Sequence, residues 1–246
     1  MPDGLLLLHA WPLDARMWEP QRAALPPGLP VAAPNHPGFG GSPLTGEATT
    51  MDRCAERALS ALDEAGIQRA LVCGLSMGGY VAFELWRRAR ERFLGLVLAN
   101  TRASADTPEG REGRLALVQR LRREGNVLAH EPPALLAEDA PAELRQGVRS
   151  LIADQTAEAV AAASLGMAER PDSTPDLPGI DIPVLVIAST GDRLIPSGAG
   201  EAMAASIPGA RLEILEAVGH LSNLEAPEAF TALLREHLTA CGLLAA

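Results

Sequence analysis

Short apolar runs alternate along this chain with longer segments in which apolar residues recur at helical spacing. The runs have the length of strands and end at glycine, proline or polar residues. Strands that alternate with helices form a parallel sheet that helices cover on both faces, so the pattern predicts an α/β fold. The expected strands cover residues 4–9, 29–34, 69–73, 94–100, 183–188 and 210–215.

The helices expected between these strands carry apolar residues at spacings of three and four. They cover residues 17–25, 50–65 and 77–90, and a last helix follows the final strand. Thr49 or Thr50 suits the cap of the second helix, because a threonine oxygen can accept a hydrogen bond from a free N–H of the first turn.

The segment GLSMGG, residues 74–79, joins the third expected strand to a helix. It places Ser76 at the tip of a sharp strand-to-helix turn. Glycine is needed at positions 74 and 78, because Cβ atoms there would collide across so tight a turn. A G-x-S-x-G pattern also arises by chance, but its place between a strand and a helix favours Ser76 as a nucleophile.

Two further polar groups follow later strands. Asp192 comes just after the run that ends at residue 188, and His220 follows the run that ends at residue 215. The carboxyl ends of parallel strands meet at one edge of the sheet, so we expect both groups to lie near Ser76. The order Ser, Asp, His along the chain is typical of hydrolases built on an open α/β sheet.

These side chains suit nucleophilic catalysis. A neutral imidazole at His220 can take the proton of Ser76, while Asp192 orients the ring and stabilises the imidazolium. The backbone N–H of Met77, at the start of a helix, can stabilise a tetrahedral oxyanion. The pattern therefore predicts acyl transfer through a serine ester.

The chain resembles the α/β-hydrolase fold superfamily, and within it the small cap-bearing esterases and enol-lactonases. Its departures are Ala10, where the family usually has glycine, and Asn35, where it usually has aspartate. The resemblance implies the N–H of Trp11 as a second oxyanion donor. It also leaves Asp106 as a competitor of Asp192 for the acid of the Ser-His-Asp triad. Some relatives place this carboxylate after the strand that is expected here to end at residue 100. The motifs that carry the resemblance lie in residues 5–18, 37–42, 74–79, 191–192 and 219–220.

The resemblance also bears on the sheet. Relatives usually carry two strands, one of them antiparallel, before the strand expected here at residues 4–9. We therefore expect an α/β-hydrolase fold with a six-stranded, wholly parallel sheet and residues 29–34 at its edge. Pro30 and Pro34 bracket that edge, and proline cannot donate to a ladder.

The alternation of strands and helices stops between residues 102 and 178, where Ala, Leu, Arg and Glu dominate between prolines. We expect these residues to form a helical cap over the active site, inserted into a core of residues 1–101 and 179–246. A separate helical domain is the alternative, although about 75 residues split by prolines make a thin core. The helices expected in the insertion cover residues 111–124, 133–137, 141–152 and 156–167.

Residues on the loops around the expected site are candidates for the substrate pocket. His9 and His36 follow the first two strands, and His9 can instead brace the oxyanion loop. The pocket candidates are His9, Ala10, His36, Leu75 and Leu221.

Composition narrows the partners and the chemistry. A formal charge of −10 argues against nucleic acid, which requires basic patches. Three cysteines form no disulfide framework, and no signal peptide or membrane-length apolar run is present, so we expect a cytoplasmic location. All 21 basic residues are arginine, which excludes Schiff-base chemistry through lysine. No clustered histidines or cysteines have metal-binding spacing, and we expect neither a metal nor an organic cofactor.

The expected function is that of a serine hydrolase acting on small carboxylic esters or lactones, as a monomer or weak homodimer. A hydroxynitrile lyase, a perhydrolase or a C–C bond hydrolase could use the same triad. A non-catalytic ligand-binding protein is the alternative from another class, and the complete set of Ser76, Asp192 and His220 argues against it. The sequence leaves the substrate open.

Overall fold

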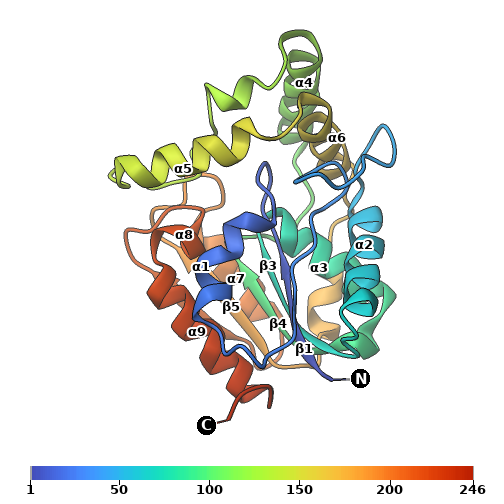
Figure 1. Ribbon diagram of the computed structural model, residues 1–246, viewed down its shortest axis with the longest axis vertical. Coiled ribbons are helices and arrows are strands. Elements are labelled where there is room, and N and C mark those ends of the chain that lie inside the picture. Colours follow the sequence, from blue (N-terminus) through green and yellow to red (C-terminus); the bar gives the residue numbers. More distant parts are fainter. Residues whose placement is uncertain (1, 246) are drawn as a thin grey trace.

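A six-stranded sheet forms the centre of the computed structural model, which describes residues 2–245. All neighbouring strands are parallel, in the order β2-β1-β3-β4-β5-β6, as the sequence predicted. Helices α1 and α9 lie on one side of the sheet and α2 and α3 on the other (Figure 1). The strands are β1 (Gly4–Leu8), β2 (Val31–Ala32), β3 (Ala70–Leu75), β4 (Phe93–Ala99), β5 (Val184–Ser189) and β6 (Arg211–Leu215).

Six predicted helices begin within three residues of their expected starts, whereas the helix at residues 197–206 was not predicted. Thr50 is the N-cap of α2, and its side chain accepts a hydrogen bond from the N–H of Arg53. Within residues 2–245, no helix is both long and apolar enough to cross a bilayer. The α-helices are α1 (Glu19–Ala24), α2 (Met51–Glu64), α3 (Met77–Arg88), α4 (Pro108–Glu124), α5 (Ala142–Ala153), α6 (Ala157–Ala168), α7 (Ser197–Ser206), α8 (Ser222–Glu225) and α9 (Pro227–Ala240).

The core lies on both faces of the central strands. Every residue of β1 and β3 is buried, which explains why these strands read as continuous apolar runs rather than alternating ones. Trp18 packs against Phe230 of α9, with ring centroids 5.9 Å apart. The central strands are therefore held in place from both sides, and so are the loops at their ends.

Strand β2 is the edge of the sheet, as expected, but it is much shorter than the predicted residues 29–34. Only Val31 and Ala32 pair with β1, opposite Leu5 and Leu6. Pro30 and Pro34 lack the N–H groups that would extend the ladder.

The segment between β4 and β5 contains α4, α5 and α6, which stand beyond the carboxyl ends of the strands (Figure 1). The helix predicted at residues 133–137 is wrong. Those residues are irregular, because their backbone bonds to the segment after β6 instead: Leu135 O accepts the N–H of Leu221 at 2.9 Å, and the N–H of Ala137 donates to Glu225 Oε2 at 3.0 Å. A short 3₁₀ helix lies earlier, at Val127–Ala129.

Helix α6 approaches the segment before α2 very closely. The N–H of Thr49 donates to the carbonyl of Ala162 at 2.9 Å, and one turn later a Cβ on Gly166 would overlap the carbonyl oxygen of Thr49. Gly147 in α5 is also helical, but it is exposed and a Cβ there would meet nothing within 4 Å.

We predict that Gly166→Ala lowers the free energy of unfolding by about 1–3 kcal/mol, because the added methyl group forces α6 away from Thr49. Gly147→Ala is the matched control and should raise it by up to about 1 kcal/mol, since alanine is the better helix former. Urea unfolding of both variants measures the difference. Equal effects of the two substitutions would contradict the close packing at Gly166.

Candidate active site

Ser76 occupies a strained turn between β3 and α3. Its backbone has φ +56° and ψ −115°, a conformation that few residues other than glycine adopt. The turn is held from the next strand: the N–H of Ser76 donates to Ala99 O at 2.9 Å, and Thr101 Oγ1 donates to Ser76 O at 2.8 Å. The conformation is therefore fixed by its neighbours and does not relax.

The glycines around Ser76 are explained by their contacts. A Cβ on Gly74 would overlap the backbone of Gly78 across the turn, and a Cβ on Gly78 would overlap the carbonyl oxygen of Leu8. A larger residue at either position would push β1, β3 and α3 apart, which agrees with the requirement inferred from the sequence.

Asp192 and His220 form a buried pair beside this turn. His220 Nδ1 lies 2.7 Å from Asp192 Oδ2, and the two side chains are almost inaccessible to solvent. Asp192 Oδ1 also accepts the N–H groups of Leu194 and Ile195, each at 2.9 Å. The pair leaves Nε2 of His220 as the ring atom that can exchange a proton.

The ionised form of Asp192 is the stable one. Burial opposes ionisation, but the hydrogen bonds from His220, Ile195 and Asn100 outweigh it and hold the pKa of Asp192 below its usual value. A carboxylate in this state can accept a hydrogen bond from Nδ1–H of His220 and so fixes the tautomer of the ring.

Asn100 is a supporting residue that the sequence reasoning missed. It lies just past β4 with φ +44° and donates from Nδ2 to Asp192 Oδ2 at 3.1 Å and to Ser189 Oγ at 3.0 Å. Its Oδ1 accepts from Ser222 Oγ at 2.6 Å. An asparagine directly after an apolar strand was an available signal, because asparagine tolerates positive φ.

Ser76 and His220 line one small cavity of about 170 Å³. Its wall comes from both the sheet loops and the inserted segment. Sequence reasoning found Ser76, His220 and Trp11, but it missed the remaining members, which are Tyr80, Arg102, Arg114, Pro133, Met167, Leu194 and Ile195.

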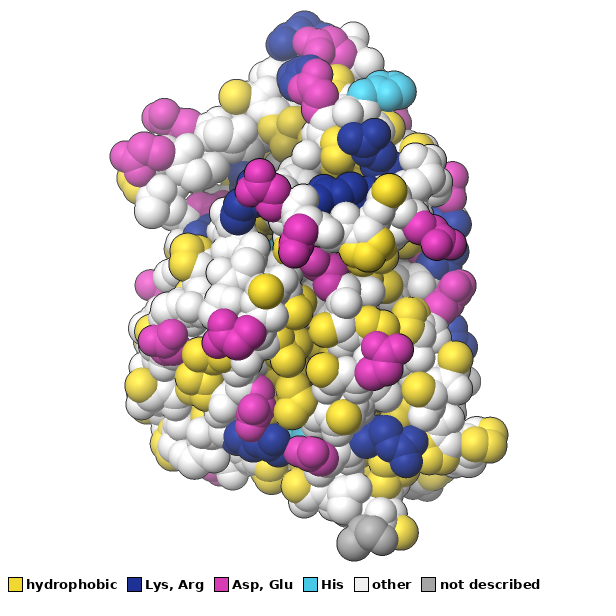
Figure 2. Space-filling view, turned by 90° about the vertical axis from the view of Figure 1, so that its left-hand side faces the viewer, with side chains coloured by type: hydrophobic (Ala, Val, Ile, Leu, Met, Phe, Trp, Pro, Cys, Tyr) yellow, Lys and Arg dark blue, Asp and Glu magenta, His cyan; other side chains and the backbone are white. Residues whose placement is uncertain are grey.

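A larger hollow of about 860 Å³ lies between α1 and α9, on the side of the molecule that Figure 2 faces. Hydrophobic side chains gather across the middle of this face. The lining of the hollow contains no serine, cysteine or histidine, so size alone does not make it the candidate site.

Asp106 does not replace Asp192 in the structure. Its carboxylate is bound by Arg102, Arg114 and Arg170 and makes no contact with His220. Burial opposes its ionisation, but Arg114 and Arg170 hold its pKa below the usual value. Asp106, which the resemblance left open as the alternative to Asp192, is therefore bound to arginines and not to the histidine.

The residues expected to provide the oxyanion donors lie on two sides of Ser76. Met77 opens α3 directly after Ser76, and Trp11 lines the cavity from the loop after β1. The indole N–H of Trp11 donates to Val160 O in α6 at 3.1 Å, which ties this loop to the inserted segment.

His9 and His36 brace the same loop from beneath. Their ring centroids lie 4.1 Å apart, and His9 Nε2 accepts the N–H of His36 at 2.9 Å. His9 therefore carries its proton on Nδ1, which donates to Ala10 O at 3.0 Å. Burial lowers the pKa of His9 to about 4, and burial beside His9 also lowers the pKa of His36, so both rings are neutral at pH 7.

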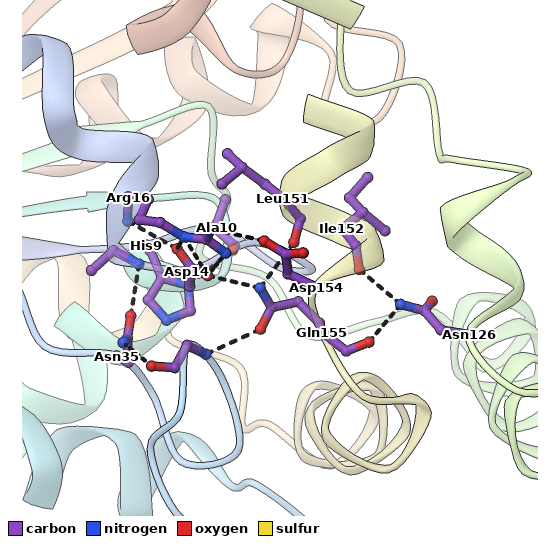
Figure 3. A network of polar contacts seen from close by, with 12 residues as sticks. His9, Ala10, Asp14, Arg16, Asn35, Asn126, Leu151, Ile152, Asp154 and Gln155 are labelled. Atoms are coloured by element: carbon purple, nitrogen blue, oxygen red, sulfur yellow. Dashed lines mark hydrogen bonds and ion pairs between the residues drawn. The ribbon is translucent and has the colours of Figure 1, made fainter. Parts of the chain in front are cut away.

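A polar network joins this loop to the inserted segment (Figure 3). Gln155 donates to Asp14 Oδ2 at 2.7 Å and accepts the N–H of Gly40 at 3.1 Å. Asn35 accepts the N–H of Ala15 at 2.8 Å and donates to Gly40 O at 2.9 Å. An aspartate, the residue usual in the family, could not make the second bond.

The pocket candidates from the sequence lie outside the cavity lining. His9, Ala10, His36, Leu75 and Leu221 are all fully buried, with no solvent-accessible surface. None of the five is among the residues that line the cavity of Ser76. The histidines face each other, and Ala10, Leu75 and Leu221 belong to the hydrophobic core, so all five support the site from behind.

Comparisons with known proteins cover nearly the whole chain. Residues 5–233 match the alpha/beta hydrolase family. A pimeloyl-[acyl-carrier protein] methyl ester esterase from Aromatoleum aromaticum is 31% identical over 96% of this chain and 97% of the relative. A 3-oxoadipate enol-lactonase from Acinetobacter baylyi is 32% identical over 88% of this chain and 81% of the relative.

Solved structures give the same result. A thermophilic esterase from Thermogutta terrifontis, studied with malate bound, is 39% identical and has a TM-score of 0.92, covering 98% of this chain and 92% of the other. An enol-lactonase from Burkholderia xenovorans is 30% identical with a TM-score of 0.86, covering 97% and 92%.

We predict that His9 makes the fold sensitive to acid. Its pKa falls from 6.5 in the unfolded chain to about 4 in the folded one, so between these values the unfolded chain binds a proton that the folded chain excludes. Stability due to the neutral ring is present above pH 6.5 and is lost as the pH falls towards 4, by about 3 kcal/mol at 1.36 kcal/mol per pKa unit.

Urea unfolding between pH 4 and 7 tests this prediction. His9→Gln should be less stable at pH 7 but should show a flatter dependence on pH. His130→Gln is the control, because His130 is exposed, and it should keep the slope of the parent protein. A slope that His9→Gln leaves unchanged would assign the acid sensitivity to other groups.

Proposed function

Because this chain belongs to the alpha/beta hydrolase family, we propose that it is a serine hydrolase of small carboxylic esters or lactones. The observation that carries the proposal is the meeting of Ser76 and His220 at one cavity, with Asp192 hydrogen-bonded to the histidine at 2.7 Å. The similarity to esterases and enol-lactonases at 30–39% identity supports the same class of reaction.

In the proposed mechanism, Ser76 Oγ attacks the carbonyl carbon while Nε2 of His220 takes its proton. Asp192 stabilises the resulting imidazolium, and the N–H groups of Trp11 and Met77 stabilise the oxyanion of the tetrahedral intermediate. His220 then protonates the leaving alkoxide, which departs as the alcohol or, in a lactone, stays attached to the acyl group. Water, deprotonated by His220, hydrolyses the acyl-serine by the same steps in reverse order.

We further propose that α4, α5 and α6, with the loops between them, act as a cap. Arg114, Pro133 and Met167 from this segment line the cavity together with Ser76. This supports a direct role of the segment in shaping the substrate pocket. The contacts from Gln155 and Val160 to the loops of the core support a cap that is held at a fixed position.

We expect Ser76→Ala and His220→Ala each to lower kcat on p-nitrophenyl acetate by roughly 10⁴- to 10⁶-fold, because either change removes the activated nucleophile. The double variant should be little worse than either single variant, since the two groups act as a unit. A fluorophosphonate should label the parent protein at Ser76, as detected by peptide mass spectrometry. Additive losses, or labelling at another residue, would contradict the mechanism.

Asp192→Asn should lower kcat by up to about 10⁴-fold, the loss that an aspartate-to-asparagine change causes in a Ser-His-Asp protease through the wrong histidine tautomer. Asp181→Asn makes the same chemical change on an exposed residue just before β5 and should leave kcat unaltered. Steady-state kinetics on one ester compares the two. An Asp192→Asn enzyme with nearly full activity would remove Asp192 from the mechanism.

A further inference from the structure

Three guanidinium groups surround a single carboxylate beside the cavity of Ser76. Asp106 contacts Arg102, Arg114 Nε at 2.5 Å and Arg170 Nη1 at 2.9 Å, and its side chain is only 2% exposed. In residues 2–245, no other carboxylate forms an ion pair with these three arginines. Three positive charges against one negative charge leave a local surplus of two.

Two of the three arginines reach the cavity, and the third supports them. Arg102 and Arg114 line the same cavity as Ser76 and His220. Arg170 lies behind them, with its guanidinium 4.1 Å from the ring centroid of Tyr80. It also donates to Met167 O at 2.8 Å and to Ser104 O at 3.0 Å. Arg170 therefore fixes Asp106, and Asp106 orients the two arginines at the cavity.

The arginines at the cavity keep free donors. Nε of Arg102 is buried and has no hydrogen-bond partner within the described chain. Arg114 donates to Asp106 through Nε alone, so its two terminal NH₂ groups have no protein acceptor among residues 2–245. The unpaired NH₂ groups of Arg114, whose side chain is 20% exposed, can take an acceptor that a ligand brings. A planar guanidinium matches a carboxylate in geometry.

The surplus charge is local to this cavity. The whole chain carries a formal charge of −10, so a general cationic surface does not account for the cluster. The volume of about 170 Å³ is close to that of an engineered cavity of about 150 Å³ that binds benzene. The part of a substrate that this cavity holds is therefore short. A carboxylate at the arginines would then lie within a few bonds of a carbonyl at Ser76.

From these contacts we propose that Arg102 and Arg114 bind a carboxylate of the substrate, so that the preferred substrate is a short ester or lactone that carries a free carboxylate. This inference rests on the proposed hydrolase function and narrows its substrate class. Met167, Leu194 and Ile195 provide the apolar wall against which the short carbon chain between the two groups packs.

Hydrolysis of monomethyl glutarate and dimethyl glutarate tests the carboxylate site, because the two esters differ only in the free acid. The parent protein should have the higher kcat/KM for the half-ester. Arg114→Gln and Arg102→Gln should each raise KM for the half-ester about 10- to 100-fold, the loss expected for a hydrogen bond to a charged group. KM for the diester should change less than about threefold, and kcat for both esters should stay similar.

Arg120→Gln is the matched control. Arg120 lies on the same helix as Arg114, is partly exposed and pairs with Glu124 and Glu131. The change therefore alters net charge equally without touching the cavity. It should leave the preference for the half-ester intact. Arg114→Lys keeps the positive charge and should recover part of the lost affinity. Unfolding midpoints of all variants separate a lost contact from a lost fold.

The outcomes distinguish this inference from the function on which it rests. Turnover that depends on Ser76 but shows no preference for the half-ester overturns the carboxylate site alone. An increase in KM in Arg114→Gln and Arg102→Gln that is equal for both esters also overturns it. Turnover of both esters that Ser76→Ala leaves unchanged overturns the proposed hydrolase and the carboxylate site together.

Discussion

The close approach of β1, β3 and α3 at Ser76 is the constraint on which the site depends. The carbonyl oxygen of Leu8 fills the space that a side chain at Gly78 would need. The backbone of Gly78 in turn fills the space that a side chain at Gly74 would need. A backbone held in a sparsely populated conformation costs on the order of 1–3 kcal/mol. Hydrogen bonds from Thr101 and to Ala99, within a sheet whose central strands are fully buried, keep Ser76 in place despite that cost.

Hydrogen bonds of two side-chain amides, Asn100 and Gln155, fix the loops on the two sides of this turn. Asn100 connects the end of β4 to Asp192 and Ser222, so the loops after three strands are fixed to one amide group. On the other side, Gln155 joins Asp14 to Gly40 and binds the inserted segment to the core. Both amides donate and accept at once, which a carboxylate could not do. The loops around the cavity are therefore positioned by satisfied buried bonds rather than by the hydrophobic core alone.

The sequence predicted those features that arise from short-range patterns. Apolar runs located the strands, and the polar residues after them located Ser76, Asp192 and His220, because parallel strands all end at one edge. Several of the residues that it missed lie in the insertion. Arg102 and Arg114 are ordinary charged residues close to Asp106 in the sequence, and only the fold brings them to the cavity of Ser76. The helix expected at residues 133–137 is absent because the backbone there bonds to Leu221 and Glu225, which are far away in the sequence.

The two edge strands of the sheet affect the tendency of the protein to aggregate at high concentration. Edge strands with free backbone groups can template the addition of a foreign strand and so begin aggregation. Strand β2 offers only two residues between prolines, too few to hold a new strand in register. At the opposite edge, β6 carries Arg211 and Glu213, joined by an ion pair at 2.7 Å, and charged side chains on an edge strand disfavour such pairing. Although 47% of the residues are hydrophobic, neither edge of the sheet favours the addition of a strand from another molecule.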